Sequence, residues 1–531
     1  MNRPIRKVAI ALGVLFAAIF VNLNFVQVVK SSDYRDHAGN QRVLLNEYAS
    51  PRGQIVVQGT PIAVSKKTKD ELKYLRSYPY GPIYAPVTGY YSFVYGRSGI
   101  EQAEDQVLSG NDERLFGTQL GSLLTGRNPE GGSVQLTLNK AAQAAAYSAM
   151  KGGDGKMRRG AVVALDPNTG AVLAAVSTPS YDPSALASHN STTIDKTWKT
   201  LNDDPSQPML NRAFNQVYAP GSVFKVIVSA AALTAGVKPT TRVPAANGYW
   251  PFDAKKTSAC PTNNPSSSCV QNFDGETCDN GKTATLEFAL AKSCNTAFAA
   301  LTVDKLGGQK LAAQAQLFGL GAPYSGAAPD LCHPPQMNIP LPVCTSTVGS
   351  QNDLSDRGSL SHTSFGQQDV RITPLQAAMI SSAVANNGTL MQPYLVAKEL
   401  RPNLSTLHET SPTQLHQVID PALDPELQSM MEGVITSPEG TGGSANITDI
   451  PGVVVGGKTG TADTGIFVHG KETPPHAWFT GFALENGTPK IAVAVIIENG
   501  GVNGNETTGG LAAAPVAKAV MEAYLKSGGG H

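Results

Sequence analysis

The stretch GVVVGGKTGTA, from Gly452 to Ala462, decides which class of fold the sequence predicts. Read literally, its first eight residues match G-x-x-x-x-G-K-T, the phosphate-binding loop of ATPases and GTPases. Such a loop needs a strand before its first glycine and a helix that begins at the lysine. Here the β-branched run Val453–Val455 lies inside the supposed loop, and residues 460–465 are poor helix formers. The stretch therefore predicts a strand that ends in Lys-Thr-Gly and excludes a nucleotide site.

The amino terminus indicates the compartment. Arg3, Arg6 and Lys7 precede an apolar run at 8–29, which is long enough to cross a hydrocarbon core. The positive-inside rule predicts a cytoplasmic stub at 1–7 and a single-pass transmembrane anchor at 8–29, with the rest of the chain outside the cell membrane. No small-x-small cleavage site closes the segment, which favours an anchor over a cleaved signal peptide. Because an exported domain meets no ATP, this topology also argues against a nucleotide site at 452–459.

The composition limits the kinds of partner and bonded group that we expect for this chain. The chain has 531 residues, 41 basic and 41 acidic, so its formal net charge is zero and we expect no nucleic-acid partner. Its six cysteines all lie in the predicted exported portion, where an even count suits disulfides. Pairing sequence neighbours, for example Cys278 with Cys294, is one of many connectivities, and free buried cysteines are the alternative. No C-x-x-C pair occurs, so we expect no metal site. The cysteines are Cys260, Cys269, Cys278, Cys294, Cys332 and Cys344.

Two units follow the predicted anchor. Residues 30–151 contain short strand-like runs and end at the glycine-rich break Lys151–Lys156. Residues 152–531 begin with two apolar runs around the turn 166–170, the strongest hairpin signal in the sequence. Helical stretches and then strands follow, which predicts an α+β fold with an antiparallel sheet flanked by helices. The helical stretches are 224–233, 285–306, 373–386 and 513–525, and the later strands are centred on 453–455, 477–483 and 491–497.

A serine and a lysine one helical turn apart form the first candidate catalytic motif. Ser222 and Lys225 share a helix face, so the amine can reach the hydroxyl. A desolvated lysine is neutral enough to take the serine proton, and the helix start offers free N–H groups for an oxyanion. The alternative is a serine that caps a helix beside a solvated lysine.

Two further motifs follow in the chain. Ser293-Cys294-Asn295 interrupts a helical stretch, where a hydroxyl can pass a proton and an amide can hold a peptide group. Its alternative is a simple loop. Lys458-Thr459-Gly460, followed by Thr461, suits the binding of a carboxylate, with the glycine allowing close approach. Each triplet is weak evidence alone, but the three in this order in an exported domain are strong.

Together the motifs resemble those of the penicillin-recognising serine enzymes. AKSCNTAF at 291–298 and GKTGTA at 457–462 are similar to sequence in class B penicillin-binding proteins. PRGQIVVQGTPIA at 51–63 and SGIEQAEDQVLSG at 98–110 are similar to two boxes of that family's non-catalytic domain. The likeness is greatest to the actinobacterial penicillin-binding protein A branch. It implies a transpeptidase fold at 152–531, preceded by a mostly β or extended non-catalytic pedestal at 30–151.

The resemblance implies a peptidoglycan D,D-transpeptidase that needs no cofactor. Ser222 would attack the penultimate D-Ala carbonyl of a stem peptide and release D-Ala, with Lys225 as its base and Ser293 relaying protons. An amine from a second stem would then take the acyl group. β-Lactams would acylate the same serine.

The same resemblance implies the substrate contacts. Asn295 would hold the amide of the stem, and the backbone N–H groups of Ser222 and Thr461 would form the oxyanion hole. The terminal carboxylate would be bound by the third motif, whose residues are Lys458, Thr459, Gly460 and Thr461.

Hydrolases and a sensor are the rival functions. A D,D-carboxypeptidase or a β-lactamase would use nearly the same site, although a β-lactamase needs no pedestal. A membrane-anchored β-lactam sensor would need a larger cytoplasmic output than residues 1–7 provide. The resemblance also implies a partner, a polytopic membrane glycosyltransferase of the shape, elongation, division and sporulation family, bound by the anchor and residues 30–151.

Overall fold

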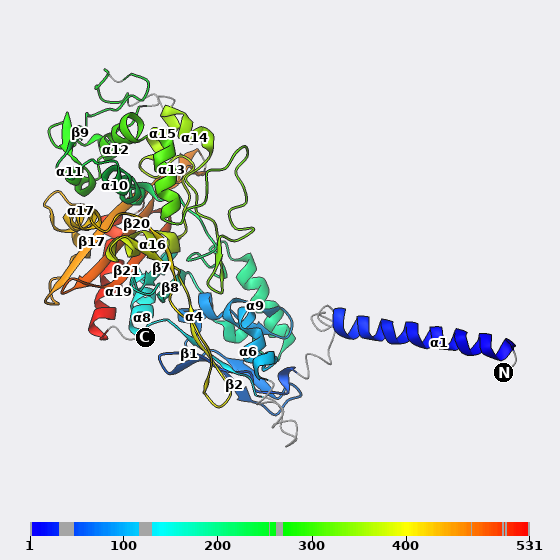
Figure 1. The fold of residues 1–531 in the computed structure, drawn as a ribbon. Helices are drawn as coiled ribbons and strands as arrows, with labels where there is room; N and C mark the ends of the chain where they lie inside the picture. The colour runs from blue at the N-terminus through cyan, green and yellow to red at the C-terminus, as the bar shows by residue number, and fades with distance from the viewer. Residues whose placement is uncertain are drawn as a thin grey trace.

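The structure is a computed structural model that describes residues 3–30, 47–115, 130–253, 255–261, 269–468, 470–501, 504 and 507–528. A pedestal, a central sheet and a helical lobe follow one another along the long axis of the molecule, and the amino-terminal helix stands apart from them (Figure 1).

The central sheet is antiparallel, as the sequence predicts. β7 and β8 form the expected hairpin, and β21 pairs with β7, so strands from the two ends of the unit lie side by side (Figure 1). β17, which carries Lys-Thr-Gly, is an edge strand, so one side of it is open to a ligand. The order is β17 (Val453–Ala462), β20 (His476–Glu485), β21 (Thr488–Ile497), β7 (Gly160–Leu165) and β8 (Val172–Thr178).

Both faces of this sheet are buried, which explains why its strands read as almost continuous apolar runs. Along β7, Val162 and Ala164 pack into the core on one face, while Ala161 and Val163 pack into the core on the other. The first face is covered by α8 (Lys140–Ala149) and α19 (Ala514–Lys526), and the second by α16 (Pro374–Ala385) and α17 (Asp424–Thr436).

The helical lobe carries two of the three predicted motifs. The turn η4 (Gly221–Phe224) leads directly into α10 (Lys225–Thr234), which is buried from Lys225 to Leu233. The stretch predicted as helical at 285–306 is broken at the second motif, because Ser293 adopts a left-handed conformation with φ of 66°. The remaining elements of the lobe are α11 (Leu286–Lys292), α12 (Asn295–Leu301), η6 (Thr302–Leu306), α13 (Gly308–Leu317), α14 (Gln351–Ser355) and α15 (Arg357–Thr363).

The pedestal is built around a second sheet and a buried ion cluster. The Glu101 carboxylate accepts hydrogen bonds from Arg52 Nε and Arg76 Nε, each at 2.6 Å, and all three side chains are buried. The sheet order is β15 (Thr406–Glu409), β14 (Val396–Leu400), β6 (Ser133–Leu136), β1 (Ile55–Val57), β2 (Thr60–Lys67) and β3 (Tyr74–Ser77). The helices beside it are α4 (Gly81–Thr88), α5 (Gly99–Ala103) and α6 (Asp105–Ser109).

The chain passes between the two units more than once, and not only at the predicted division between residues 151 and 152. Helix α8 lies before that division, yet it packs on α19 and β8. Conversely, the hairpin β14–β15 lies far beyond it and pairs with β6 of the pedestal sheet. Helix α8 buries Ala142 and Ala146 against a face of the central sheet, whereas the β14–β15 hairpin extends the pedestal sheet by pairing its backbone with β6.

Short ribbons and turns complete the described chain. The two-stranded ribbons are β4 (Tyr91–Ser92) with β5 (Gly96–Arg97), β9 (Arg242–Pro244) with β10 (Thr283–Thr285), β11 (Met337–Asn338) with β12 (Pro342–Val343), β13 (Thr389–Met391) with β16 (Gln414–Gln417) and β18 (Phe467–Val468) with β19 (Lys471–Glu472). The other helices and turns are α9 (Ser191–Asp203), α18 (Gly509–Ala512), η2 (Glu113–Leu115), η3 (Pro183–Ala185), η5 (Phe273–Gly275), η7 (Gly443–Ala445) and η8 (Glu498–Gly500).

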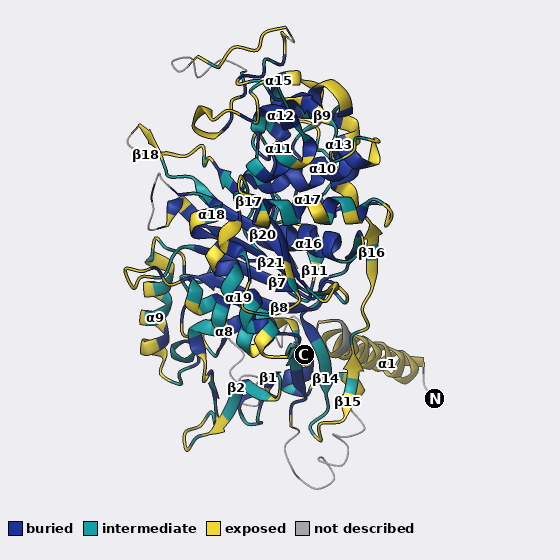
Figure 2. Cartoon of the chain, turned by 90° about the vertical axis from the view of Figure 1, so that its left-hand side faces the viewer, coloured by how far each residue is buried: buried dark blue, intermediate teal, exposed yellow. Residues whose placement is uncertain are grey.

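The predicted anchor is helical. α1 (Arg3–Asn24) continues into a short π-helix, η1 (Phe25–Val29), and this is the one helix of the described residues long and apolar enough to cross a membrane. None of its apolar window is buried against the protein, and Figure 2 shows α1 exposed along its length.

The six cysteines form three disulfides between sequence neighbours: Cys260–Cys269, Cys278–Cys294 and Cys332–Cys344.

Candidate active site

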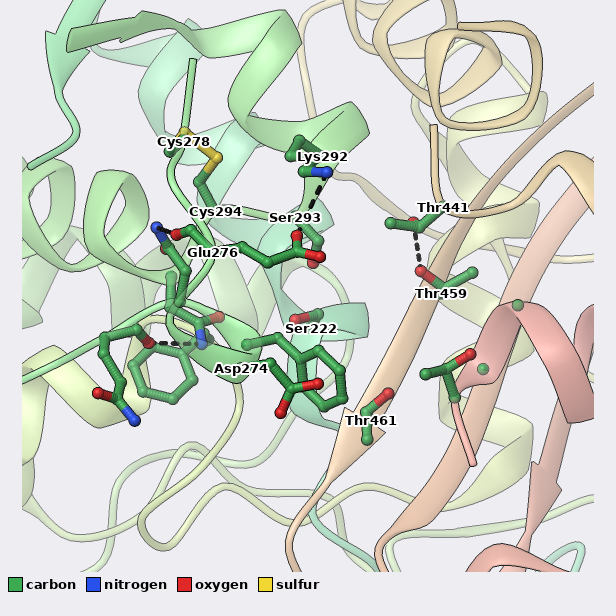
Figure 3. A pocket seen from close by; sticks show the side chains of 18 of the residues that line it. Ser222, Asp274, Glu276, Cys278, Lys292, Ser293, Cys294, Thr441, Thr459 and Thr461 are labelled. Carbon is green, nitrogen blue, oxygen red and sulfur yellow. Dashed lines mark hydrogen bonds and ion pairs between the residues drawn. A yellow bond between two sulfur atoms is a disulfide. The ribbon is translucent and has the colours of Figure 1, made fainter. Parts of the chain in front are cut away.

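The three predicted motifs meet at one pocket of about 790 Å³, between the helical lobe and the open edge of β17 (Figure 3). Five of the predicted residues line this pocket: Ser222, Ser293, Asn295, Thr459 and Thr461. The other three, Lys225, Lys458 and Gly460, are buried behind its surface.

Ser222 lies in the tight turn η4, pressed against the end of β17. The preceding Gly221 has φ of 53°, and a Cβ there would lie 2.5 Å from the carbonyl oxygen of Thr461. Gly460 contributes from the other side, since a Cβ on it would lie 2.8 Å from the carbonyl oxygen of Pro220. We expected Gly460 to admit a substrate, but the space is filled by the turn that carries Ser222. The two glycines therefore let the turn that carries Ser222 and the strand β17 approach each other.

Two lysines converge on Ser293. Lys225 Nζ donates to the Ser293 carbonyl oxygen at 2.7 Å and to Ser293 Oγ at 3.2 Å, and Lys458 Nζ donates to the same Oγ at 2.9 Å. Lys225 also donates to Asn295 Oδ1 at 2.7 Å. Within the described chain, no hydrogen bond joins Lys225 to the Ser222 hydroxyl, which we had expected from their spacing.

The burial of both lysines changes their chemistry. Burial lowers the pKa of Lys225 well below its usual value, and the positive charge of Lys458 lowers it further. Burial also lowers the pKa of Lys458 to about 7. Neither lysine has a carboxylate partner among the described residues, so nothing opposes these shifts. The lowered pKa increases the fraction of Lys225 in the neutral form, which is the form that can act as a base.

The second motif owes its geometry to the break between α11 and α12. The left-handed conformation of Ser293 ends α11 and presents both its carbonyl and its hydroxyl oxygen to Lys225. Asn295 begins α12, and its two ends are both engaged, with Oδ1 accepting from Lys225 and Nδ2 donating to the Gln271 carbonyl oxygen at 3.1 Å. The side chains of Ser293 and Asn295 are thus held in place by hydrogen bonds, and the motif is not a plain loop.

The third motif presents hydroxyls to the pocket. Thr459 and Thr461 alternate with Gly460 along β17, so their side chains point to the same side of the strand. Thr459 Oγ1 forms a 2.5 Å hydrogen bond with Thr441 Oγ1, which comes from the segment after α17 (Figure 3). Thr441 was missed by the sequence reasoning, because a single threonine in a Gly-rich segment gives no signal.

A cysteine-rich stretch that precedes the second motif in the sequence forms one wall of the pocket. No role could be assigned to this stretch from its residues alone, yet residues 269–278 contribute most of that wall, and Cys278 is bonded to Cys294 in the middle of the second motif (Figure 3). Asn272 Oδ1 accepts a hydrogen bond from the Thr296 backbone N–H at 3.1 Å. The only usable sequence signal was the pair of cysteines, one inside the motif and one in the stretch before it.

A lysine bridge spans the same side of the pocket. Lys292 Nζ lies 3.2 Å from Glu276 Oε2 of the cysteine-rich wall and 3.2 Å from Glu439 Oε2 of the segment after α17. These three residues were also missed, since single charged side chains on loops or at a helix end carry no pattern. The described residues contain no cluster of His, Cys, Asp and Glu side chains that could hold a metal ion.

Comparisons with known proteins show the family to which the chain belongs. Residues 160–522 match the family described as the penicillin binding protein transpeptidase domain, and residues 52–134 match the penicillin binding protein A dimerisation domain. The chain is 43% identical to the peptidoglycan D,D-transpeptidase PbpA of Mycolicibacterium smegmatis, over 99% of this chain and 100% of the relative. It is 40% identical to PbpA of Mycobacterium tuberculosis, over 99% of each chain.

Solved structures show the same likeness. Penicillin-binding protein A from M. tuberculosis, as its ceftriaxone acyl-enzyme complex, superposes with a TM-score of 0.80 at 40% identity, over 91% of this chain and 100% of that chain. The imipenem acyl-enzyme complex of the same protein superposes with a TM-score of 0.78, also at 40% identity, over 91% of this chain and 100% of that chain.

Proposed function

Because this chain belongs to the family of penicillin-binding protein transpeptidases, we propose that it is a peptidoglycan D,D-transpeptidase that uses Ser222 as its nucleophile. It cross-links stem peptides through an acyl-enzyme, releases D-Ala, and is inhibited by β-lactams. The observation that carries this proposal is the convergence of Lys225 and Lys458 on Ser293 at a pocket that Ser222 lines.

Lys225 is the base that activates Ser222. Its amine is buried and lies one helical turn beyond the serine, and its lowered pKa leaves a neutral fraction to accept the hydroxyl proton. The serine oxygen then attacks the penultimate D-Ala carbonyl carbon. The backbone N–H groups of Ser222 and Thr461 stabilise the oxyanion, and the close approach of the η4 turn to β17 supports this role.

Ser293 carries the proton to the leaving amine. Its hydroxyl accepts hydrogen bonds from both lysines, so its own proton is free to be donated toward the substrate. As that proton leaves, Lys225 replaces it, and the terminal D-Ala departs as a neutral amine. Asn295 holds the amide of the stem, a role supported by the fixed orientation of its side chain.

The third motif holds the terminal carboxylate of the stem. Thr459 and Thr461 offer hydroxyl donors on the pocket side of β17, and Lys458 supplies positive charge from behind them. Gly460 contributes by letting the strand lie against the nucleophile turn.

We extend the proposal to topology and partners. Residues 1–7 lie in the cytoplasm and 8–29 cross the membrane. Residues 30–151, apart from helix α8, form the pedestal, and residues 152–531, apart from the β14–β15 hairpin, form the transpeptidase domain outside the membrane. The exposed apolar surface of α1 supports the anchor. The anchor and pedestal bind a membrane glycosyltransferase of the shape, elongation, division and sporulation family, a role supported only by resemblance.

Labelling with a fluorescent penicillin tests the nucleophile. We expect a stable covalent label on the full chain that is lost in Ser222→Ala, while the folded state of the variant is unchanged by circular dichroism. Rapid loss of the label from the parent would indicate a β-lactamase. Incubation with a D-Ala-D-Ala peptide and an amine acceptor then separates the remaining alternatives: a transpeptidase forms an amide product, a D,D-carboxypeptidase releases only hydrolysed peptide, and a sensor releases neither.

A further inference from the structure

A second pocket, of about 640 Å³, adjoins the active-site pocket. The two share Gln367 and Asp463, so they form one continuous depression. None of the eight predicted site residues lines the second pocket. It lies instead along residues 216–219, just before the nucleophile turn, and along residues 463–467, just after the end of β17. A ligand there would approach Ser222 from outside the three motifs.

The walls of this pocket are rich in amides and guanidinium groups. Four glutamines and two arginines line it: Gln207, Gln216, Gln367, Gln368, Arg159 and Arg371. Arg371 donates through Nη1 to the carbonyl oxygens of Gln368 and Val370, and it pairs with no carboxylate in the described chain. A guanidinium without a carboxylate partner, set among amide side chains, suits a peptide that carries a carboxylate.

The nearby carboxylate Glu498 does not neutralise Arg371. Glu498 Oε1 accepts hydrogen bonds from Arg212 Nε at 2.7 Å and from the Tyr218 hydroxyl at 2.8 Å, and Glu498 Oε2 lies 3.1 Å from Arg159. These contacts occupy Glu498 at the floor of the pocket and hold Tyr218 in its wall. Arg371 therefore keeps its positive charge for a ligand.

Asp463 stands where the two pockets meet. Its side chain is exposed, and it has no hydrogen-bond or ion-pair partner among the described residues. Beyond it the hairpin β18–β19 extends as an exposed projection (Figure 2). An unpaired carboxylate at the junction attracts an ammonium group and can accept one of its protons.

The proposed reaction requires a second substrate with these charges. If the donor stem ends in a carboxylate, an acceptor stem of the same kind carries a carboxylate as well as an amine. The amine must reach the acyl group on Ser222 while the rest of the acceptor lies elsewhere. The first pocket is already bounded by the groups that hold the donor.

We propose that the second pocket binds the acceptor stem peptide, with Arg371 holding a carboxylate and Asp463 holding the ammonium beside the acyl-enzyme. This inference rests on the proposed transpeptidase function. The acceptor ammonium gives one proton to the Asp463 carboxylate and becomes a neutral amine. Its nitrogen attacks the ester carbon, so a C–N bond forms and the bond from carbon to Ser222 Oγ breaks. The second nitrogen proton passes to Ser222 Oγ, which restores the free hydroxyl.

The test separates the two half-reactions in the full chain, kept in detergent. Acylation is followed with a fluorescent penicillin. Transfer is followed by the ratio of amide product to hydrolysed product from an acyl-D-Ala-D-Ala donor, as the concentration of a stem-peptide acceptor is raised. The variants are Arg371→Gln and Asp463→Asn. The matched controls are Arg401→Gln, in the β14–β15 hairpin, and Asp154→Asn, in the exposed turn after α8.

We expect Arg371→Gln to raise the acceptor concentration at half-maximal transfer by about 10- to 100-fold, as expected for loss of a charge-assisted contact. Amidating the acceptor's carboxylate should weaken transfer in the parent but cause little further loss in Arg371→Gln, because the partner is already gone. Asp463→Asn should lower transfer at saturating acceptor. Acylation should stay within about twofold in both variants, and both controls should match the parent.

Three results would overturn the inference in distinguishable ways. Unchanged transfer in Arg371→Gln, with a parent that transfers, removes the inference and leaves the proposed function intact. A fall in acylation that parallels the fall in transfer assigns the pocket to the donor stem. A parent that acylates but only hydrolyses the donor, whatever the acceptor, removes the proposed function and the inference together.

Discussion

Lys225 and Lys458 come from different parts of the fold, a buried helix and an edge strand, yet both donate a hydrogen bond to the hydroxyl oxygen of Ser293. Burial lowers the pKa of both lysines, and the positive charge of Lys458 lowers the pKa of Lys225 further. In the proposed mechanism, Lys225 supplies a neutral amine as the base and Lys458 supplies a titratable positive charge for the substrate carboxylate.

The first prediction concerns pH. The proposed mechanism requires a neutral Lys225 and a charged Lys458 for acylation, so a plot of the second-order rate constant for penicillin against pH should be bell-shaped. Its falling limb should lie at about pH 7, because Lys458 has a pKa of about 7 in the free enzyme and loses its charge as the pH rises. Stopped-flow acylation across this range checks it. Lys458→Gln, which is neutral at every pH, should be slow and lack the falling limb. A rate constant that still rises well above neutral pH would contradict the assignment.

The second prediction concerns Lys225 as the base. Lys225→Met keeps a long buried side chain but removes the amine, so acylation should fall by about 10²- to 10⁴-fold. Single-turnover labelling with fluorescent penicillin measures the loss. Lys238→Met, on the exposed turn after α10, serves as the control and should acylate at the parent rate. If Lys225→Met labels as fast as the control, another group must activate Ser222.

The sequence predicted those features of the fold and the site that have a signal in neighbouring residues. The antiparallel sheet and the hairpin of β7 and β8 were predictable because buried strands and a Pro-Asn-Thr-Gly turn are local signals. The convergence of the motifs was predictable from their order once the family resemblance was noticed. The direct bond expected between Lys225 and Ser222 was not found, because spacing along a helix gives proximity but not the competing acceptors on Ser293 and Asn295.

Features that depend on distant contacts could not be predicted. The β14–β15 hairpin pairs with the pedestal sheet, and Thr441 forms a hydrogen bond with Thr459. No local sequence pattern predicts either contact. The cysteine-rich wall is of the same kind. Its residues look like an exposed excursion, and only the bond from Cys278 to Cys294 reveals that it borders the active site.

The third prediction uses that disulfide. Replacing Cys278 and Cys294 together by serine opens a loop with a sequence separation of 16, so stability should fall by about 3 kcal/mol. Acylation should also slow by about 10- to 100-fold, because Ser293 and Asn295 flank Cys294 and lose their fixed position. The matched control is the double variant Cys332→Ser with Cys344→Ser, whose sequence separation is 12. It should lose a similar amount of stability and acylate at the parent rate. Equal acylation rates in the two double variants would refute the link.

The fourth prediction concerns the contact between β17 and the turn η4, which carries Ser222. Gly460→Ala places a Cβ 2.8 Å from the carbonyl oxygen of Pro220, which belongs to the backbone and cannot swing away. The cost should be about 1–3 kcal/mol of stability, together with slower acylation as Ser222 is displaced. Thermal unfolding and penicillin labelling measure the two effects. Gly153→Ala, where a Cβ meets nothing within 4 Å, is the control. Normal labelling by Gly460→Ala would show that the turn tolerates displacement.

The fifth prediction separates the pedestal from the chemistry. Glu101 is fully buried between Arg52 and Arg76, so Glu101→Ala leaves two buried guanidinium groups without their shared carboxylate. Removing one partner of a buried ion cluster typically costs about 3–5 kcal/mol. The pedestal should therefore become sensitive to protease within residues 47–115, while penicillin acylation at Ser222 proceeds at the parent rate. Asp203→Ala breaks the exposed pair with Lys199 and should change neither property. If acylation fell together with pedestal protection in Glu101→Ala, the two units would be energetically coupled through the β14–β15 hairpin that bridges them.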